Sequence, residues 1–67
     1  MSYIFKADLA ARYFPFVSRR SAMRLLRAEI QRRKDLYDEL LAAGYTVTSQ
    51  RFSPKEVAII ANFLGDS

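Results

Sequence analysis

The chain has 67 residues, with two Gly, two Pro and no Cys, His or Trp. This length predicts one domain with a small core, and a composition that is 51% hydrophobic and 27% charged excludes disordered, collagen-like and low-complexity chains. Without Cys or His, the chain has no disulfide, no thiolate or imidazole metal site and no Cys or His catalyst. We therefore expect a binding module with no cofactor, no metal and no small-molecule substrate, and not an enzyme.

Charge is distributed unevenly along the chain, although the net charge is only +4. Residues 12–34 carry eight Lys and Arg against one Glu, whereas residues 35–67 carry two against five acidic residues, so the two parts differ in sign, at +7 and −3. Most of the cations are arginines, whose rigid guanidinium fork suits phosphate and carboxylate groups. The basic part of the domain is thus a candidate surface for a polyanion.

No run of about 18 apolar residues is present, so we expect no membrane-spanning helix. The first residues, Met-Ser-Tyr-Ile-Phe-Lys, lack the charged region, apolar stretch and cleavage site of a secretory signal. These features predict a cytoplasmic protein without a membrane partner.

Helical spacing of Leu9, Ala10 and Tyr13 predicts a first helix over residues 6–14, which Pro15 ends because proline disfavours helical geometry in the residue before it. A second helix is expected to begin at Ser18, a residue type that caps helix N-termini. At about 100° per residue this helix has two stripes. The apolar stripe holds Ala22, Met23, Leu26 and Ile30, and the second, called here the arginine stripe, holds Arg20, Arg24, Arg27 and Gln31.

Residues 18–43 are compatible with one long helix, because Tyr37, Leu40 and Leu41 stay in phase with the apolar stripe. Such a helix would be ~39 Å long at ~1.5 Å per residue, against the ~28 Å diameter of a compact chain of this size. Asp35, which is followed by two more acidic residues, also resembles a helix cap. We therefore favour two helices with a break between residues 33 and 35, the second ending at Gly44.

Aromatic and β-branched residues at positions 45 and 47 predict an extended segment or a tiny β-hairpin over residues 45–52, with Tyr45 and Phe52 as core anchors. Ser53, Pro54 and Glu56 then form the clearest helix start in the chain, and Gly65 is the expected stop. The whole pattern predicts a mostly α fold of four short helices, helix-turn-helix-like, with the extended segment or tiny hairpin before the last helix.

Two segments, Tyr13-Phe14-Pro15 and Phe52-Ser53-Pro54-Lys55-Glu56-Val57, are the most specific parts of a resemblance that spans nearly the whole chain. The chain resembles a family of short bacterial proteins, associated with Bacteroides-type genomes, that is known only as domain-of-unknown-function family 4248. The resemblance implies one complete domain over residues 1–67 and supplies no activity.

A second resemblance is to helix-turn-helix domains of the excisionase-like and winged types. Residues 6–10 are similar to their first helix, residues 18–22 to the start of their recognition helix, and residues 45–52 to a short wing. The segment 13–17 departs from the pattern, because it is longer and more aromatic than the tight Gly-containing turn of those domains. This resemblance implies a DNA-binding module.

The arginine stripe is the main candidate site. Recognition helices place Arg and Gln against guanine and adenine edges, while flanking Arg and Lys hold phosphates. Arg32 and Arg33 at the helix end belong to that flanking set, and the predicted contacts to duplex DNA are Arg19, Arg20, Arg24, Arg27, Gln31, Lys34 and Arg51. The same side chains are also compatible with a solvated face that keeps a small domain soluble.

The alternative function is a protein-interaction or oligomerisation module that binds no nucleic acid. In it the basic face meets an acidic partner, and Ile59 and Phe63, which widen the apolar arc of the last helix to about 200°, form a homodimer or partner surface. In the competing interpretation, residues 3–5 cover Ile59 and Phe63 within the monomer.

Two further groups have a functional and a structural interpretation. Tyr13, Phe14 and Phe16 suit stacking on single-stranded bases, but we favour core plugs at the helix junction. Asp35, Asp38 and Glu39 suit a metal or an acid/base pair, but we interpret them as helix N-terminal charge.

Overall fold

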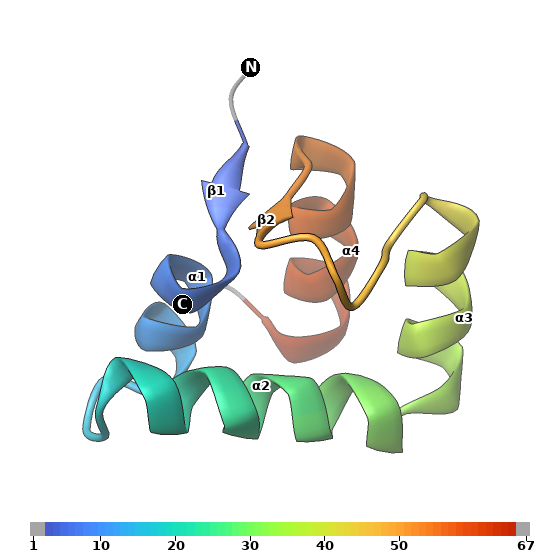
Figure 1. The fold of residues 1–67 in the computed structure, drawn as a ribbon. Coiled ribbons are helices and arrows are strands. Elements are labelled where there is room, and N and C mark those ends of the chain that lie inside the picture. Colours follow the sequence, from blue (N-terminus) through green and yellow to red (C-terminus); the bar gives the residue numbers. More distant parts are fainter. Residues whose placement is uncertain (1–2, 66–67) are drawn as a thin grey trace.

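The computed structural model describes residues 3–65, which form four helices and two short strands (Figure 1). In chain order these are β1 (Ile4–Phe5), α1 (Lys6–Tyr13), α2 (Arg19–Arg32), α3 (Lys34–Ala42), β2 (Arg51–Phe52) and α4 (Pro54–Leu64). Helix α2 lies along one side of the molecule, and α1 and α3 pack against it near its two ends (Figure 1). The mostly α fold class with four helices is therefore confirmed.

The chain between residues 19 and 42 is two helices, as predicted. Arg33 separates them with extended backbone angles, φ −93° and ψ 98°, and it serves both as the C-cap of α2 and as the N-cap of α3. The break lets the chain fit within a molecule whose longest extent is 30 Å. The predicted cap at Asp35 is wrong, because the backbone leaves helical geometry two residues earlier and places Asp35 inside the first turn of α3.

The predicted helix starts at Ser18 and Ser53 and the predicted stop at Gly44 are confirmed. The Ser18 hydroxyl accepts a hydrogen bond from the Ser21 amide at 3.2 Å. At the start of α4 the Ser53 hydroxyl accepts from the Glu56 amide, while the Ser53 amide donates to Glu56 Oε1 at 2.7 Å, a reciprocal capping box. Gly44 follows α3 with a φ of 95°, a left-handed backbone angle that favours glycine.

The extended segment before α4 contains strand β2, which pairs with the N-terminal strand β1. The pairing is antiparallel, with Ile4 opposite Phe52 and Phe5 opposite Arg51. The backbone amide of Lys6 also donates to the carbonyl of Gln50 at 2.9 Å. The sequence predicted either an extended segment or a tiny β-hairpin, and the structure has the extended segment. Its pairing with β1 brings the loop 46–50 beside the start of α1.

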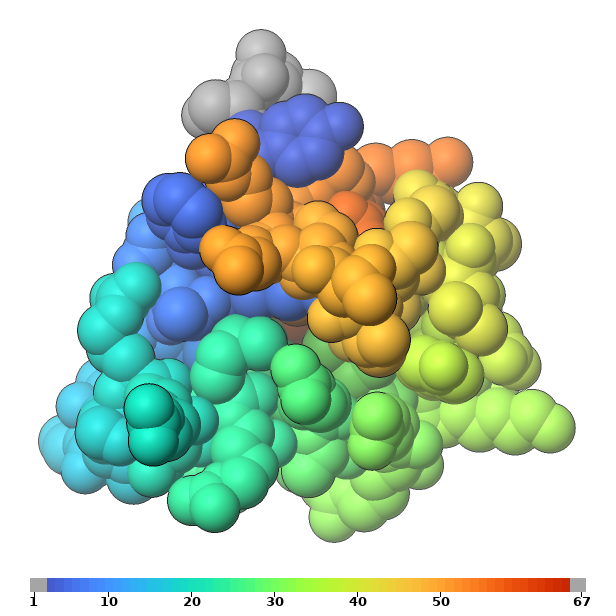
Figure 2. All heavy atoms as spheres, viewed as in Figure 1, coloured from blue at the N-terminus to red at the C-terminus, as the bar shows by residue number. Residues whose placement is uncertain are grey.

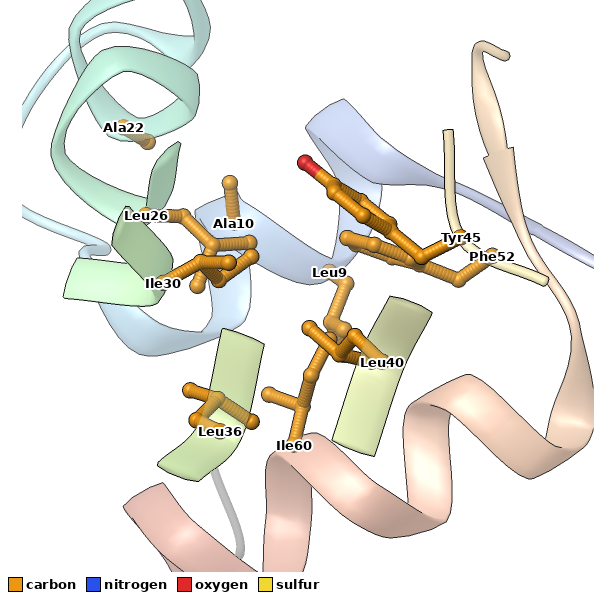
Figure 3. Packing of buried hydrophobic residues seen from close by; sticks show 10 residues of the cluster. All are labelled: Leu9, Ala10, Ala22, Leu26, Ile30, Leu36, Leu40, Tyr45, Phe52 and Ile60. Atoms are coloured by element: carbon orange, nitrogen blue, oxygen red, sulfur yellow. The ribbon is translucent and has the colours of Figure 1, made fainter. Parts of the chain in front are cut away.

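Ten buried hydrophobic residues form the core shown in Figure 3, and every helix contributes to it. They are Leu9, Ala10, Ala22, Leu26, Ile30, Leu36, Leu40, Tyr45, Phe52 and Ile60. The predicted anchors Tyr45 and Phe52 stack on each other with ring centroids 6.2 Å apart. Three members of the apolar stripe are fully buried, and Met23 is half-buried.

The aromatic residues at the end of α1 and in the turn before α2 divide into two kinds. Tyr13 and Phe14 are half-buried against the core, and the Tyr13 hydroxyl donates to the carbonyl of Gly65 at 2.6 Å. Phe16 is 97% exposed, so its interpretation as a core plug is wrong. The physical reason is that residues 15–17 form a surface turn, in which Pro15 and Val17 are also exposed.

Candidate nucleic-acid interface

The arginine stripe is a solvent-exposed face of α2. Arg20, Arg24, Arg27 and Gln31 are all exposed, while the apolar stripe of the same helix faces the core. Within residues 3–65, no carboxylate forms an ion pair with Arg20, Arg24 or Arg27. The three guanidinium groups thus present their charge and donors to solvent.

The other cations predicted around the stripe are partly engaged. Arg19 pairs with Asp8 of α1, and Arg32 and Arg33 both pair with Glu29, the latter at 3.0 Å. Hydrogen bonds from Arg32 and Arg33 lower the pKa of the Glu29 carboxyl. Among residues 3–65, Arg20, Arg24 and Arg27 therefore form no ion pair, whereas the cations that flank them in the sequence, Arg19, Arg32 and Arg33, do.

Lys34 and Arg51 lie off α2. Lys34 is the exposed first residue of α3, beyond the break at Arg33. Arg51 lies in β2 with its guanidinium carbon 4.8 Å from the centroid of the Phe5 ring, within cation–π range. Both side chains are exposed, so both stay among the predicted contacts to DNA.

A cleft of about 580 Å³ lies between the N-terminal half of α2 and the loop 46–50. Figure 2 shows it as a hollow between the green side chains of α2 and the orange loop. Its lining comes from three segments, namely Phe5, Lys6 and Ala7; Arg19, Met23 and Arg27; and Val47, Thr48, Ser49 and Gln50. A smaller recess of about 290 Å³ lies on the surface of α2 between Arg20, Met23, Arg24 and Arg27.

Lys6 holds the loop wall of this cleft in place. Its side chain is buried, its ammonium donates to the carbonyl of Thr46 at 2.6 Å, and it lies 4.5 Å from the centroid of the Tyr45 ring. Burial lowers the pKa of Lys6, a nearby Glu56 opposes that shift, and the charge of Arg27 adds to it.

Sequence reasoning missed both the cleft and Lys6. The cleft requires the loop 46–50 to fold back onto the start of α1, which no local pattern indicates. Lys6 did carry a signal, because it stands at helical spacing with Leu9, Ala10 and Tyr13 on the buried arc of α1. A cation on that arc has to find partners within the fold.

The predicted interaction surface on α4 is only partly available to a partner. Ile59 and Phe63 are half-buried and pack against the core. Their role in self-association stays a prediction.

Across the helices described in residues 3–65, none combines the length and the apolar character that crossing a membrane requires.

A family model described as a domain of unknown function (DUF4248) matches residues 2–66 of the chain. No curated protein and no solved structure matches it.

Proposed function

Since the chain belongs to the DUF4248 family, whose description names no activity, we propose from its own surface that it is a duplex DNA-binding module. Helix α2 enters the major groove, and the arginine stripe makes the contacts to bases and nearby phosphates. A cytoplasmic location belongs to this proposal.

The observation that carries the proposal is the exposed arginine stripe without carboxylate partners in residues 3–65. Three unpaired guanidinium groups on one helix face repel one another, so a polyanion that neutralises them binds favourably. Arginine forks suit guanine edges and phosphates, and the Gln31 amide suits an adenine edge. A face that only solubilised the domain would be served equally well by charges of both signs.

The dimensions of α2 fit the groove. Its 14 residues span ~21 Å at ~1.5 Å per residue, and a helix with its side chains is about as wide as the ~12 Å major groove. Recognition helices contact bases with their N-terminal residues. Arg20 and Arg24 stand in that half of α2, and Gln31 stands one residue before its end.

Arg19, Lys34 and Arg51 are the flanking phosphate contacts in this proposal. Arg19 has to exchange its Asp8 carboxylate for a phosphate. That exchange costs little, because exposed ion pairs contribute only about 0–1 kcal/mol.

Fluorescence anisotropy with labelled random duplex, single-stranded DNA and heparin, from low to physiological salt, tests the proposal. We expect duplex to be preferred, with log K falling against log salt at a slope of about −3.6 if four phosphates are neutralised. The double variant Arg24→Gln/Arg27→Gln is expected to bind less tightly and to reduce the magnitude of the slope by up to about 1.8.

The matched control is Arg12→Gln/Lys55→Gln, which removes the same net charge from exposed positions on α1 and α4. It is expected to bind duplex like the parent. Equal losses in the two double variants, or no duplex binding at low salt, would contradict a site on α2.

A further inference from the structure

The cleft between α2 and the loop 46–50 carries an excess of positive charge. Its lining includes Lys6, Arg19 and Arg27 and no Asp or Glu. Lys6 and Arg19 have nearby carboxylates, Glu56 and Asp8, which offset their charge. Arg27 forms no ion pair in the part of the chain that the structure describes, and its field lowers the pKa of Lys6. An anionic group is therefore the ligand that this cleft attracts.

Apolar side chains stand beside that charge on both walls of the cleft. Met23 lies one helical turn before Arg27 on α2, and Val47 and Phe5, 53% and 46% exposed, line the cleft from the other segments. Exposed apolar surface next to an unpaired cation suits a ligand that has both a flat apolar part and a charged part. Thr48 and Gln50 add exposed hydrogen-bonding groups.

The size of the cleft fits one small ligand. Its volume of about 580 Å³ lies within the range of about 300–1,000 Å³ that is usual for small-molecule sites. A nucleotide combines the required parts, because its phosphate pairs with an arginine fork and its base offers an apolar face and hydrogen-bonding edges.

We propose that this cleft binds a single nucleotide, with Arg27 on the phosphate and the base against Met23, Phe5 and Val47. The nucleotide is either a free mononucleotide or one unit of a nucleic-acid strand. In the second case the inference rests on the proposed function, and the nucleotide belongs to a single-stranded segment next to the bound duplex, because bases within a duplex are paired and stacked. The cleft then holds that strand beside the arginine stripe, since Arg27 belongs to both surfaces.

Titration of the ¹⁵N-labelled protein with deoxyadenosine monophosphate, followed by amide chemical shifts, tests the site. We expect shifts on both walls, at residues 23–27 and 47–50, and weaker shifts with inorganic phosphate, which lacks the base. Arg27→Gln is expected to weaken mononucleotide binding by about tenfold or more, because it removes a charge-assisted hydrogen bond.

Arg24→Gln is the matched control, since Arg24 lies on the same helix and the same stripe but does not line the cleft. It is expected to weaken duplex binding and to leave mononucleotide affinity unchanged. Val47→Asp is the complementary variant, which places a carboxylate in the cleft at an exposed loop position and is expected to abolish nucleotide binding.

Titration with a single-stranded oligonucleotide distinguishes the two sources, a free mononucleotide and one unit of a nucleic-acid strand. Tighter binding of the oligonucleotide than of the mononucleotide, lost in Val47→Asp, identifies a strand unit, and equal affinity identifies a free nucleotide. No shifts at millimolar mononucleotide, equal effects of Arg24→Gln and Arg27→Gln, or shifts with an acidic peptide instead would overturn the inference. Mononucleotide binding without duplex binding would overturn the proposed function alone.

Discussion

The buried ammonium of Lys6 lies 4.5 Å from the centroid of the Tyr45 ring, and the same group donates a hydrogen bond to the carbonyl of Thr46. One side chain of α1 thus contacts the beginning of the loop that forms the opposite wall of the cleft. Tyr45 in turn stacks on Phe52 of β2, so the loop is fixed by its two aromatic ends and by one cation.

We predict that Lys6→Met lowers the free energy of unfolding by at most about 1–2 kcal/mol, because a hydrogen bond and a cation–π contact are lost while the desolvation cost that lowers the pKa of Lys6 is removed. Amide hydrogen exchange in the loop 46–50 should become faster. Urea denaturation and hydrogen exchange check both effects. Lys55→Met, at an exposed position on α4, is the control and should leave both unchanged.

Tyr45 predicts a pH dependence of stability. Burial raises the pKa of its phenol, the charge of Arg27 lowers it, and Tyr37 and Glu56 add to the rise. The folded protein therefore holds the phenol proton more tightly than the unfolded chain, and this contribution to stability is present below pH 10 and is lost as the pH rises through the folded pKa. Tyr45→Phe cannot lose this contribution, so urea denaturation should show the variant gaining stability relative to the parent above pH 10. A constant difference between the two proteins would contradict this assignment.

We predict that substitution of Gly44 changes stability through the backbone angle alone, without a steric clash of the new side chain. Its φ is 95°, and a Cβ built at this position meets no atom within 4 Å. Gly44→Ala should therefore cost about 1–2 kcal/mol from the left-handed backbone alone, and Gly44→Asn should cost less, since Asn tolerates that region better. Thermal or urea unfolding measures both, and equal losses would point to a cause other than the backbone angle.

We predict that substitution of Phe16 has little effect on stability, unlike substitution of a buried phenylalanine. Because its side chain is 97% exposed, Phe16→Ser should change the free energy of unfolding by no more than about 0.5 kcal/mol. Phe52→Ala, at a fully buried position, should cost about 3–5 kcal/mol. A large loss at Phe16 would show that the side chain packs on the domain in solution.

The helix ends were predictable because their signals are local. Ser18, Ser53 with Glu56, Gly44 and Gly65 act within one turn of their own backbone, so sequence spacing alone identifies them. The buried arc of α2 was predictable for the same reason, and its exposed complement, the arginine stripe, followed from it.

What sequence reasoning missed depends on contacts between distant residues. Phe16 looked like a core residue because it is aromatic, but the core was already filled from other elements and the turn carries it outward. Asp35 looked like a cap by residue type, whereas the position of the break was decided at Arg33. The cleft needed the pairing of β1 with β2, which joins residues near the start of the chain to the segment just before α4.

That pairing also sets an order of events during folding. Helices α1, α2 and α3 follow one another along the chain and pack on their sequence neighbours, so they need only short loops to meet, whereas β1 and β2 lie far apart along the chain and close a long loop when they pair. We therefore expect the arginine stripe to form early and the cleft to form last. During synthesis, the chain would therefore expose the arginine stripe of α2 before the loop 46–50, the other wall of the cleft, has been made.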